Sequence, residues 1–200
     1  MEPVVKKRRG RPSEGAREAV IAAAHGLFME RDYDEVSTEE ILDRSGVSRG
    51  ALYHHFPTKL DLFRAVFMAS ERRVIDRIAA EAPASGTPFE AILHLCKGYL
   101  RAAESDEELR RIGLGQSRAV LGWEGWRDAC GEFGVGLALA GASAAIAAGE
   151  LPPRDPETTG MVLLGTMIEA ATLVVAAEDP AAQRERSEAL IVDLLEGLRR

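Results

Sequence analysis

The sequence predicts an all-α fold in which a small N-terminal helix-turn-helix domain of three helices precedes a larger helical domain. Apolar residues recur at helical spacing along nearly all of the 200 residues, and no stretch alternates long enough for a strand. Two short helices with their own start and stop signals lie between Val36 and Lys59. A chain of this length with 46% hydrophobic residues can bury one small and one medium-sized core.

The first element is a basic arm, residues 1–13, which contains the run KKRRGRP. This run has no apolar side chain to bury, so we expect it to be flexible until it meets an anion. Arg9 and Arg11 flank a glycine, as in the AT-hook, whose extended Arg-Gly-Arg lies in a narrow A·T-rich minor groove. The arm is therefore predicted to reach DNA, and a solvated basic tail is the alternative.

The next helix opens a domain predicted over residues 14–67. Its inward stripe consists of four apolar residues at helical spacing, Val20, Ala24, Leu27 and Phe28. The two helices that follow it carry more specific signals.

The second helix has a recognisable start and end. Ser37 precedes Glu40 by three residues, so its hydroxyl can accept from the Glu40 amide while the carboxylate reaches the Ser37 amide, forming a capping box. Val36 and Ile41 are spaced to pack together as a hydrophobic staple. Gly46 permits the left-handed conformation that ends a helix.

The third helix begins at the capping residue Ser48 and is stopped by a proline after Phe56. Helical projection points Leu52 and Phe56 inward, and Gly50 and His54 outward. The outward face is small at its start and aromatic at its end, which suits a major groove about 12 Å wide. An ordinary pair of surface helices is the alternative.

The segment VSTEEILDRSGVSRGALYHHFPTKLDLF resembles the DNA-binding segment of the TetR family of one-component bacterial transcription regulators. The family pattern has a Thr-rich helix start, Ile, a Gly-Val-Ser turn, a Leu-Tyr-x-x-Phe recognition helix and a following Lys, and the resemblance covers about residues 17–67. It implies that Arg49, Gly50 and Ala51 contact base edges, and that Tyr53 and His54 contact bases or phosphates. Thr38, His55 and Lys59 are implied to contact the phosphate backbone. The expected DNA-binding residues are Arg49, Gly50, Ala51, Tyr53, His54, His55, Lys59, Thr38 and Ser48, with Arg9 and Arg11 of the arm.

One departure from the family pattern precedes this segment. Asp32 stands before Tyr33, where the family commonly has glycine. Because aspartate tolerates a positive φ, we expect the first helix to end there with slight strain.

A long fourth helix is expected from Thr58 toward Ala82, where prolines and a glycine break it. Lys59 at its start adds positive charge to amides already aimed at a phosphate. A second domain is predicted over residues 83–200. Its helices are expected near residues 88–104, 106–121, 124–149, 156–177 and 183–199.

The net charge of −7 is unevenly distributed along the chain. Residues 1–65 carry 11 Lys or Arg and 11 Asp or Glu, so the whole excess of acid lies after residue 65. The chain is therefore not a general polyanion binder, and its attraction to DNA must come from the arm and the recognition helix.

The sequence argues against a membrane protein, a secreted protein, a zinc protein and an enzyme. Residues 133–148 are uncharged, but they are short for a bilayer span and rich in Gly and Ala, so we predict a packed helix and no membrane contact. No apolar run follows the basic residues of the amino terminus, which argues against secretion, and Cys96 and Cys130 lack zinc-site spacing. With no catalytic or phosphate-binding pattern, we expect a cytoplasmic protein that is not an enzyme and holds no metal or cofactor.

The last two predicted helices carry more apolar surface than one side of a monomer core can cover. Two such helices from each of two chains would form a four-helix interface, so we predict a homodimer through them. TetR-family members usually dimerise in this way, and a core-only role is the alternative. The apolar residues are Met161, Val162, Leu163, Leu164, Met167, Ile168, Leu173, Val174 and Val175, then Leu190, Ile191, Leu194, Leu195 and Leu198.

The resemblance also implies that the second domain binds a small-molecule effector, whose identity the sequence does not reveal. Candidate residues are polar or aromatic groups on otherwise apolar helices, and for each one singly the alternative is packing in the core or an interface. Glu169 needs a partner, either a cationic ligand group or an arginine. The candidates are His94, Cys96, Tyr99, Gln116, Trp123, Trp126, Met161 and Glu169.

The function expected from these features is a ligand-responsive repressor that binds a palindromic DNA operator as a dimer and is released by its effector. Two-fold symmetry places the half-sites about one helical turn apart, near 34 Å, or somewhat more. The alternative is a DNA-binding regulator of the same fold without an effector, controlled by a protein partner or by its concentration. An enzyme is the third class.

Overall fold

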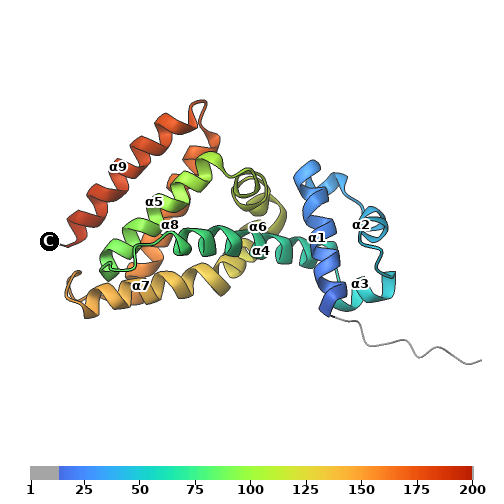
Figure 1. The fold of residues 1–200 in the computed structure, drawn as a ribbon, viewed down its shortest axis with the longest axis horizontal. Coiled ribbons are helices and arrows are strands. Elements are labelled where there is room, and N and C mark those ends of the chain that lie inside the picture. Colours follow the sequence, from blue (N-terminus) through green and yellow to red (C-terminus); the bar gives the residue numbers. More distant parts are fainter. Residues whose placement is uncertain (1–13, 200) are drawn as a thin grey trace, which may run out of the picture. The chain divides into compact units, whose positions relative to one another are not determined.

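The computed structural model describes residues 14–199, which form helices and contain no strand (Figure 1). The predicted all-α fold class is therefore confirmed. The predicted DNA contacts of Arg9 and Arg11 lie outside the described residues. The chain divides into two compact units, Met1–Val66 and Phe67–Arg200, and the division falls inside one continuous helix.

The first unit consists of short helices drawn in blue to cyan in Figure 1. Helix α1 packs against α2 and α3, and the predicted inward stripe of α1 is buried. The elements are α1 (Glu14–Glu30), the 3-10 turn η1 (Tyr33–Glu35), α2 (Thr38–Ser45), α3 (Arg49–His55) and the start of α4 (Lys59–Ala80).

The predicted boundaries of α2 are confirmed. Ser37 Oγ accepts a hydrogen bond from Glu40 N at 3.2 Å, and Glu40 Oε2 accepts one from Ser37 N at 2.8 Å. Gly46 ends the helix with φ 65° and ψ 12°, the left-handed conformation. Val36 and Ile41 are both buried, as expected for a hydrophobic staple.

The turn after α1 differs from the expectation of a strained, positive φ at Asp32. This residue has φ −71° and ψ 157°, and no residue of 14–199 other than glycine has a positive φ. The expectation was wrong because the chain leaves α1 through an extended residue, which needs no left-handed conformation. Asp32 N then donates to Glu35 Oε2 at 3.1 Å across the η1 turn.

The second unit is a helical bundle in which α5 contacts α7, α8 and α9, and α8 packs against α7 and α9. Helix α5 starts at Pro88 because Thr87 and Glu90 form a second capping box. After the C-terminal part of α4, the elements are α5 (Pro88–Ser105), η2 (Leu109–Gln116), α6 (Ser117–Cys130), η3 (Gly131–Val135), α7 (Gly136–Ala147), α8 (Pro156–Ala176) and α9 (Pro180–Leu198).

The middle of the second unit is less regular than the sequence pattern predicts. Both η2 and η3 are π-helical segments, which hydrophobic periodicity did not indicate. Gly122 has φ 67° and ψ 171° and interrupts α6, in agreement with the predicted break between residues 121 and 124. The expected helix at 124–149 continues through η3 into α7 and ends at Ala147.

Within residues 14–199, α8 is the one helix long and apolar enough to cross a membrane by length and composition. Central helices of helical bundles share these properties, and α8 packs against α5, α7 and α9. Only 28% of its most apolar stretch is buried in the single chain. We therefore assign α8 to the bundle, with part of its apolar surface left uncovered in the monomer.

Candidate DNA-reading and ligand-binding sites

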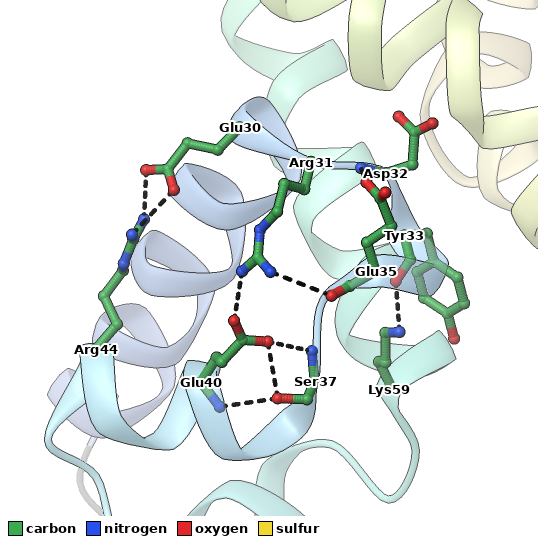
Figure 2. A network of polar contacts seen from close by, with 9 residues as sticks. All are labelled: Glu30, Arg31, Asp32, Tyr33, Glu35, Ser37, Glu40, Arg44 and Lys59. Carbon is green, nitrogen blue, oxygen red and sulfur yellow. Dashed lines mark hydrogen bonds and ion pairs between the residues drawn. The ribbon is translucent and has the colours of Figure 1, made fainter.

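A network of polar contacts fixes α2 on the end of α1 (Figure 2). Arg31 Nη2 pairs with Glu40 Oε1 at 2.6 Å, and Arg44 holds both carboxylate oxygens of Glu30 at 2.7 and 3.0 Å. Hydrogen bonds from the Ser37 amide, from Arg31 and from the Ser37 hydroxyl lower the pKa of Glu40 to about 2. These contacts hold α2 at a defined angle on α1, and α3 also packs against α1.

Helix α3 has one buried face and one exposed face, as its sequence predicts. Leu52 and Phe56 are almost completely buried. On the other side, a Cβ atom added at Gly50 would meet no atom within 4 Å, and Tyr53 and His54 are exposed. The start of α3 is therefore shallow enough for close approach to the edges of base pairs.

Arg49, the first residue of α3, is paired with Glu39 of α2. Arg49 Nη2 lies 2.7 Å from Glu39 Oε1, and the two side chains are 59% and 63% exposed. The hydrogen bond lowers the pKa of Glu39 and raises that of Arg49. Solvent screens an exposed pair and leaves it weak, so Arg49 can exchange Glu39 for a guanine at little cost.

Two of the predicted phosphate contacts are turned partly inward. Lys59 Nζ donates to the Tyr33 carbonyl and lies 3.9 Å from the centre of the Tyr33 ring, and burial lowers its pKa. Figure 2 shows this contact. His55 Nε2 is buried and has no hydrogen-bond partner among the described residues. Phosphate binding by Lys59 or His55 remains a prediction.

The other predicted DNA contacts lie at the starts of α2 and α3. Thr38 is the first residue of α2 and is half-buried. Ser48 Oγ caps α3 by accepting from Ala51 N at 3.3 Å, and Ala51 is also half-buried. Their backbone positions are well defined by the caps, while contacts with DNA remain predictions.

The second unit contains a cavity of about 520 Å³ with an almost entirely apolar wall. Its volume falls in the usual range of small-molecule sites, about 300–1,000 Å³. The wall is formed by α4 to α8 together with η2 and η3. Four of the residues expected to contact an effector line it: His94, Cys96, Tyr99 and Trp126.

The other expected residues, Gln116, Trp123, Met161 and Glu169, lie outside this wall. Trp123 is 64% exposed and stacks on Trp126, with ring centroids 5.7 Å apart. Glu169 is also exposed, and its Oε2 lies 3.5 Å from Nη1 of Arg118. Of the two partners considered for Glu169, the structure therefore shows the arginine.

Glu71 on α4 lines the cavity and was not predicted from the sequence. Its Oε2 accepts a hydrogen bond from the Tyr99 hydroxyl at 3.0 Å, whereas its Oε1 is buried without a hydrogen-bond partner among the described residues. Burial first, and then the acidic Asp106 and Glu108, raise its pKa to about 7. The sequence offers one signal for this position: Glu71 is an acid on the same helical face as the apolar residues Phe67 and Ile78.

The remaining polar groups in the wall are neutral or satisfied. His94 Nε2 is hydrogen-bonded to the Ile78 carbonyl at 2.9 Å. Burial raises the pKa of both Cys96 and Cys130 to about 12, so these thiols stay protonated and unreactive at neutral pH. The cavity is therefore suited to holding a largely apolar molecule.

Helices α8 and α9 carry four large aliphatic side chains that are exposed in the single chain. These are Val162, Leu173, Leu190 and Leu194, which are between 49% and 61% exposed. Exposed apolar surface concentrated on two neighbouring helices is typical of a protein–protein interface.

Two family models match the chain. The model of bacterial regulatory proteins of the tetR family matches residues 20–66, and that of the tetracyclin repressor-like C-terminal domain matches residues 89–198. Among curated relatives, the chain is 32% identical over 120 residues to the HTH-type transcriptional activator FasR of Mycolicibacterium smegmatis. The match covers 52% of this chain and 53% of FasR, so the chain spans about half the length of this relative.

Solved structures resemble the chain over nearly its full length. A TetR-family transcriptional regulator from Pectobacterium atrosepticum is 30% identical, with a TM-score of 0.77, covering 92% of this chain and 94% of that one. RolR in complex with resorcinol superimposes with a TM-score of 0.69, covering 93% of each chain. Its identity of 18% supports similarity of fold alone.

Proposed function

Because the chain belongs to the TetR family, whose members are DNA-binding regulators of transcription, we propose that it is a ligand-responsive repressor. It binds a palindromic operator as a homodimer and leaves the operator when a small molecule fills the cavity of the second unit. In this proposal residues 14–67 bind DNA, α4 links through to about residue 82, and residues 83–200 bind the effector and the second subunit. The protein works in the cytoplasm and catalyses no reaction.

The observation that carries the proposal is the pairing of an exposed recognition helix with a ligand-sized cavity in one chain. Helix α3 presents Arg49, Gly50 and Tyr53 to solvent, and the cavity has a volume of about 520 Å³. RolR, a protein of the same fold, binds resorcinol. Helix α4 contributes residues to both units, so a ligand that favours one position of this helix can change DNA affinity.

The proposed dimer follows from the exposed apolar residues of α8 and α9. Leu190→Glu, at a position that is 60% exposed in the single chain, should yield monomers and weaken operator binding. Leu139→Glu is the matched control, because Leu139 is 38% exposed but lies on α7. Sedimentation analysis decides the matter, and a Leu190→Glu variant that remains dimeric would contradict the predicted interface.

The effector proposal is tested in two steps. First, the full-length protein selects duplexes from a pool of genomic fragments, and sequencing of the retained DNA gives the operator. Then thermal unfolding is measured against a metabolite panel with and without that operator. A compound that raises the melting temperature and releases the DNA supports a ligand-responsive regulator. If no compound does both, the alternative of a regulator without a small-molecule effector is favoured.

A further inference from the structure

The cavity wall contains one carboxylate in otherwise apolar surroundings. Among residues 14–199, Glu71 is the one Asp, Glu, Lys or Arg that lines the cavity. It lies on α4 in the same stripe as Phe67, Ile75 and Ile78, all of which are buried. A carboxylate placed among such residues loses most of its hydration and needs compensation from a partner.

Hydrogen bonds and charges within the protein stabilise the Glu71 carboxylate only in part. Tyr99 donates its hydroxyl proton to Oε2 at 3.0 Å, but Oε1 has no hydrogen-bond partner among the described residues. The charged groups that act on Glu71 are Asp106 and Glu108, and both are acidic. Arg118, one of two arginines on α6, is instead paired with Glu169 and lies over the Trp126 ring. The site therefore lacks one hydrogen-bond donor and one positive charge.

The carboxyl group borders the cavity and faces a glycine in its wall. Oε1 lies against Gly113 of η2, where an added Cβ atom would approach it to 2.5 Å. A side chain at position 113 would therefore crowd Glu71, and glycine leaves this space open. The terminal torsion of glutamate is soft, so rotation can present one oxygen to the cavity while Tyr99 keeps the other.

We propose that the effector is a lipophilic amine, with an apolar body that fills the cavity and a protonated nitrogen that binds the Glu71 carboxylate. This inference rests on the proposed function, because it names the chemical class of the effector. An ammonium group supplies both the missing charge and the missing donor. An alcohol supplies only the donor, and a carboxylic acid would place a second negative charge beside Glu71.

The test uses three probes with the same chain and different head groups: decylamine, decanol and decanoic acid. Binding to the full-length protein is measured by titration calorimetry at pH 8, with tryptophan fluorescence as a second signal, because Trp126 lines the cavity. Decylamine should bind at least about tenfold more tightly than either of the other probes, since a charge-assisted hydrogen bond is about twice as strong as a neutral one.

Two variants assign the preference to Glu71. Glu71→Gln should weaken decylamine binding by about tenfold or more and leave decanol binding nearly unchanged. Asp76→Asn is the matched control, because it removes the same charge from an exposed position on the same helix. It should change neither affinity.

The outcomes separate this inference from the proposed function. Equal affinities for amine and alcohol, a preference for the acid, or an amine preference that persists in Glu71→Gln would overturn the amine inference, while the cavity would stand as a ligand site. If none of the probes binds, the proposed effector cavity is overturned, and the inference about Glu71 falls with it.

Discussion

Replacing Glu71 with glutamine should make the protein more resistant to unfolding at alkaline pH than the unaltered chain. The native structure raises the pKa of this carboxyl from 4.5 to about 7, first by burial and then through Asp106 and Glu108. An acid with a raised native pKa favours folding in its protonated form, so its stabilising effect is complete below pH 4.5 and is lost as pH rises through about 7. Glutamine has no charge to bury at any pH.

The size of the effect follows from the difference between the two pKa values. The difference between a pKa of 4.5 and one of about 7 corresponds to about 3 kcal/mol, because a tenfold change in an equilibrium constant is worth about 1.4 kcal/mol. Between pH 5 and pH 8 the variant should gain about 2–3 kcal/mol in free energy of unfolding relative to the unaltered protein, and the gain should level off above pH 8. The glutamine amide adds an offset of about 1–3 kcal/mol if its donors are unsatisfied, but that offset does not depend on pH.

Urea unfolding of both proteins at a series of pH values measures this difference. Equal protomer concentrations are needed, because dimerisation contributes to apparent stability. Groups that titrate equally in both proteins cancel from the comparison, and Asp76→Asn again serves as the exposed control. A stability difference that stays constant from pH 5 to pH 9 would refute the argument, since it would mean that the carboxyl has an ordinary pKa in the folded state.

The DNA-binding unit leads to four further predictions. Arg49→Ala should cost about 1–3 kcal/mol on the preferred operator and relax sequence choice in competition binding, and an equal loss on all duplexes would argue against base reading. Glu39→Gln should tighten binding most to the preferred operator, because it frees Arg49 from an acidic partner at 2.7 Å; unchanged affinity would show that the pair does not compete with DNA. Lys59→Met should lower thermal stability through loss of the Tyr33 contact, and an unaltered dependence of Kd on salt would limit Lys59 to that structural role. Ser37→Ala should reduce the free energy of unfolding in urea by about 1 kcal/mol, and Ser37→Thr should retain most of it.

The sequence determined the helix-turn-helix almost completely, because its signals act over three or four residues. The bonds between Ser37 and Glu40 and the left-handed Gly46 depend on neighbours along the chain, and the structure has them where they were predicted. The buried face of α3, with Leu52 and Phe56, follows from helical spacing in the same way. The resemblance to a family then connected this local geometry to DNA binding.

Contacts between distant segments were decided only by the tertiary structure. The environment of Glu71 depends on Tyr99, which is 28 residues away, and on the space left by Gly113. Conversely, Glu169 looked like a buried carboxylate in an apolar helix, but it faces outward toward Arg118. Periodicity tells which side chains share a helix face, whereas burial, charge compensation and the shape of a cavity depend on which other helices pack against that face.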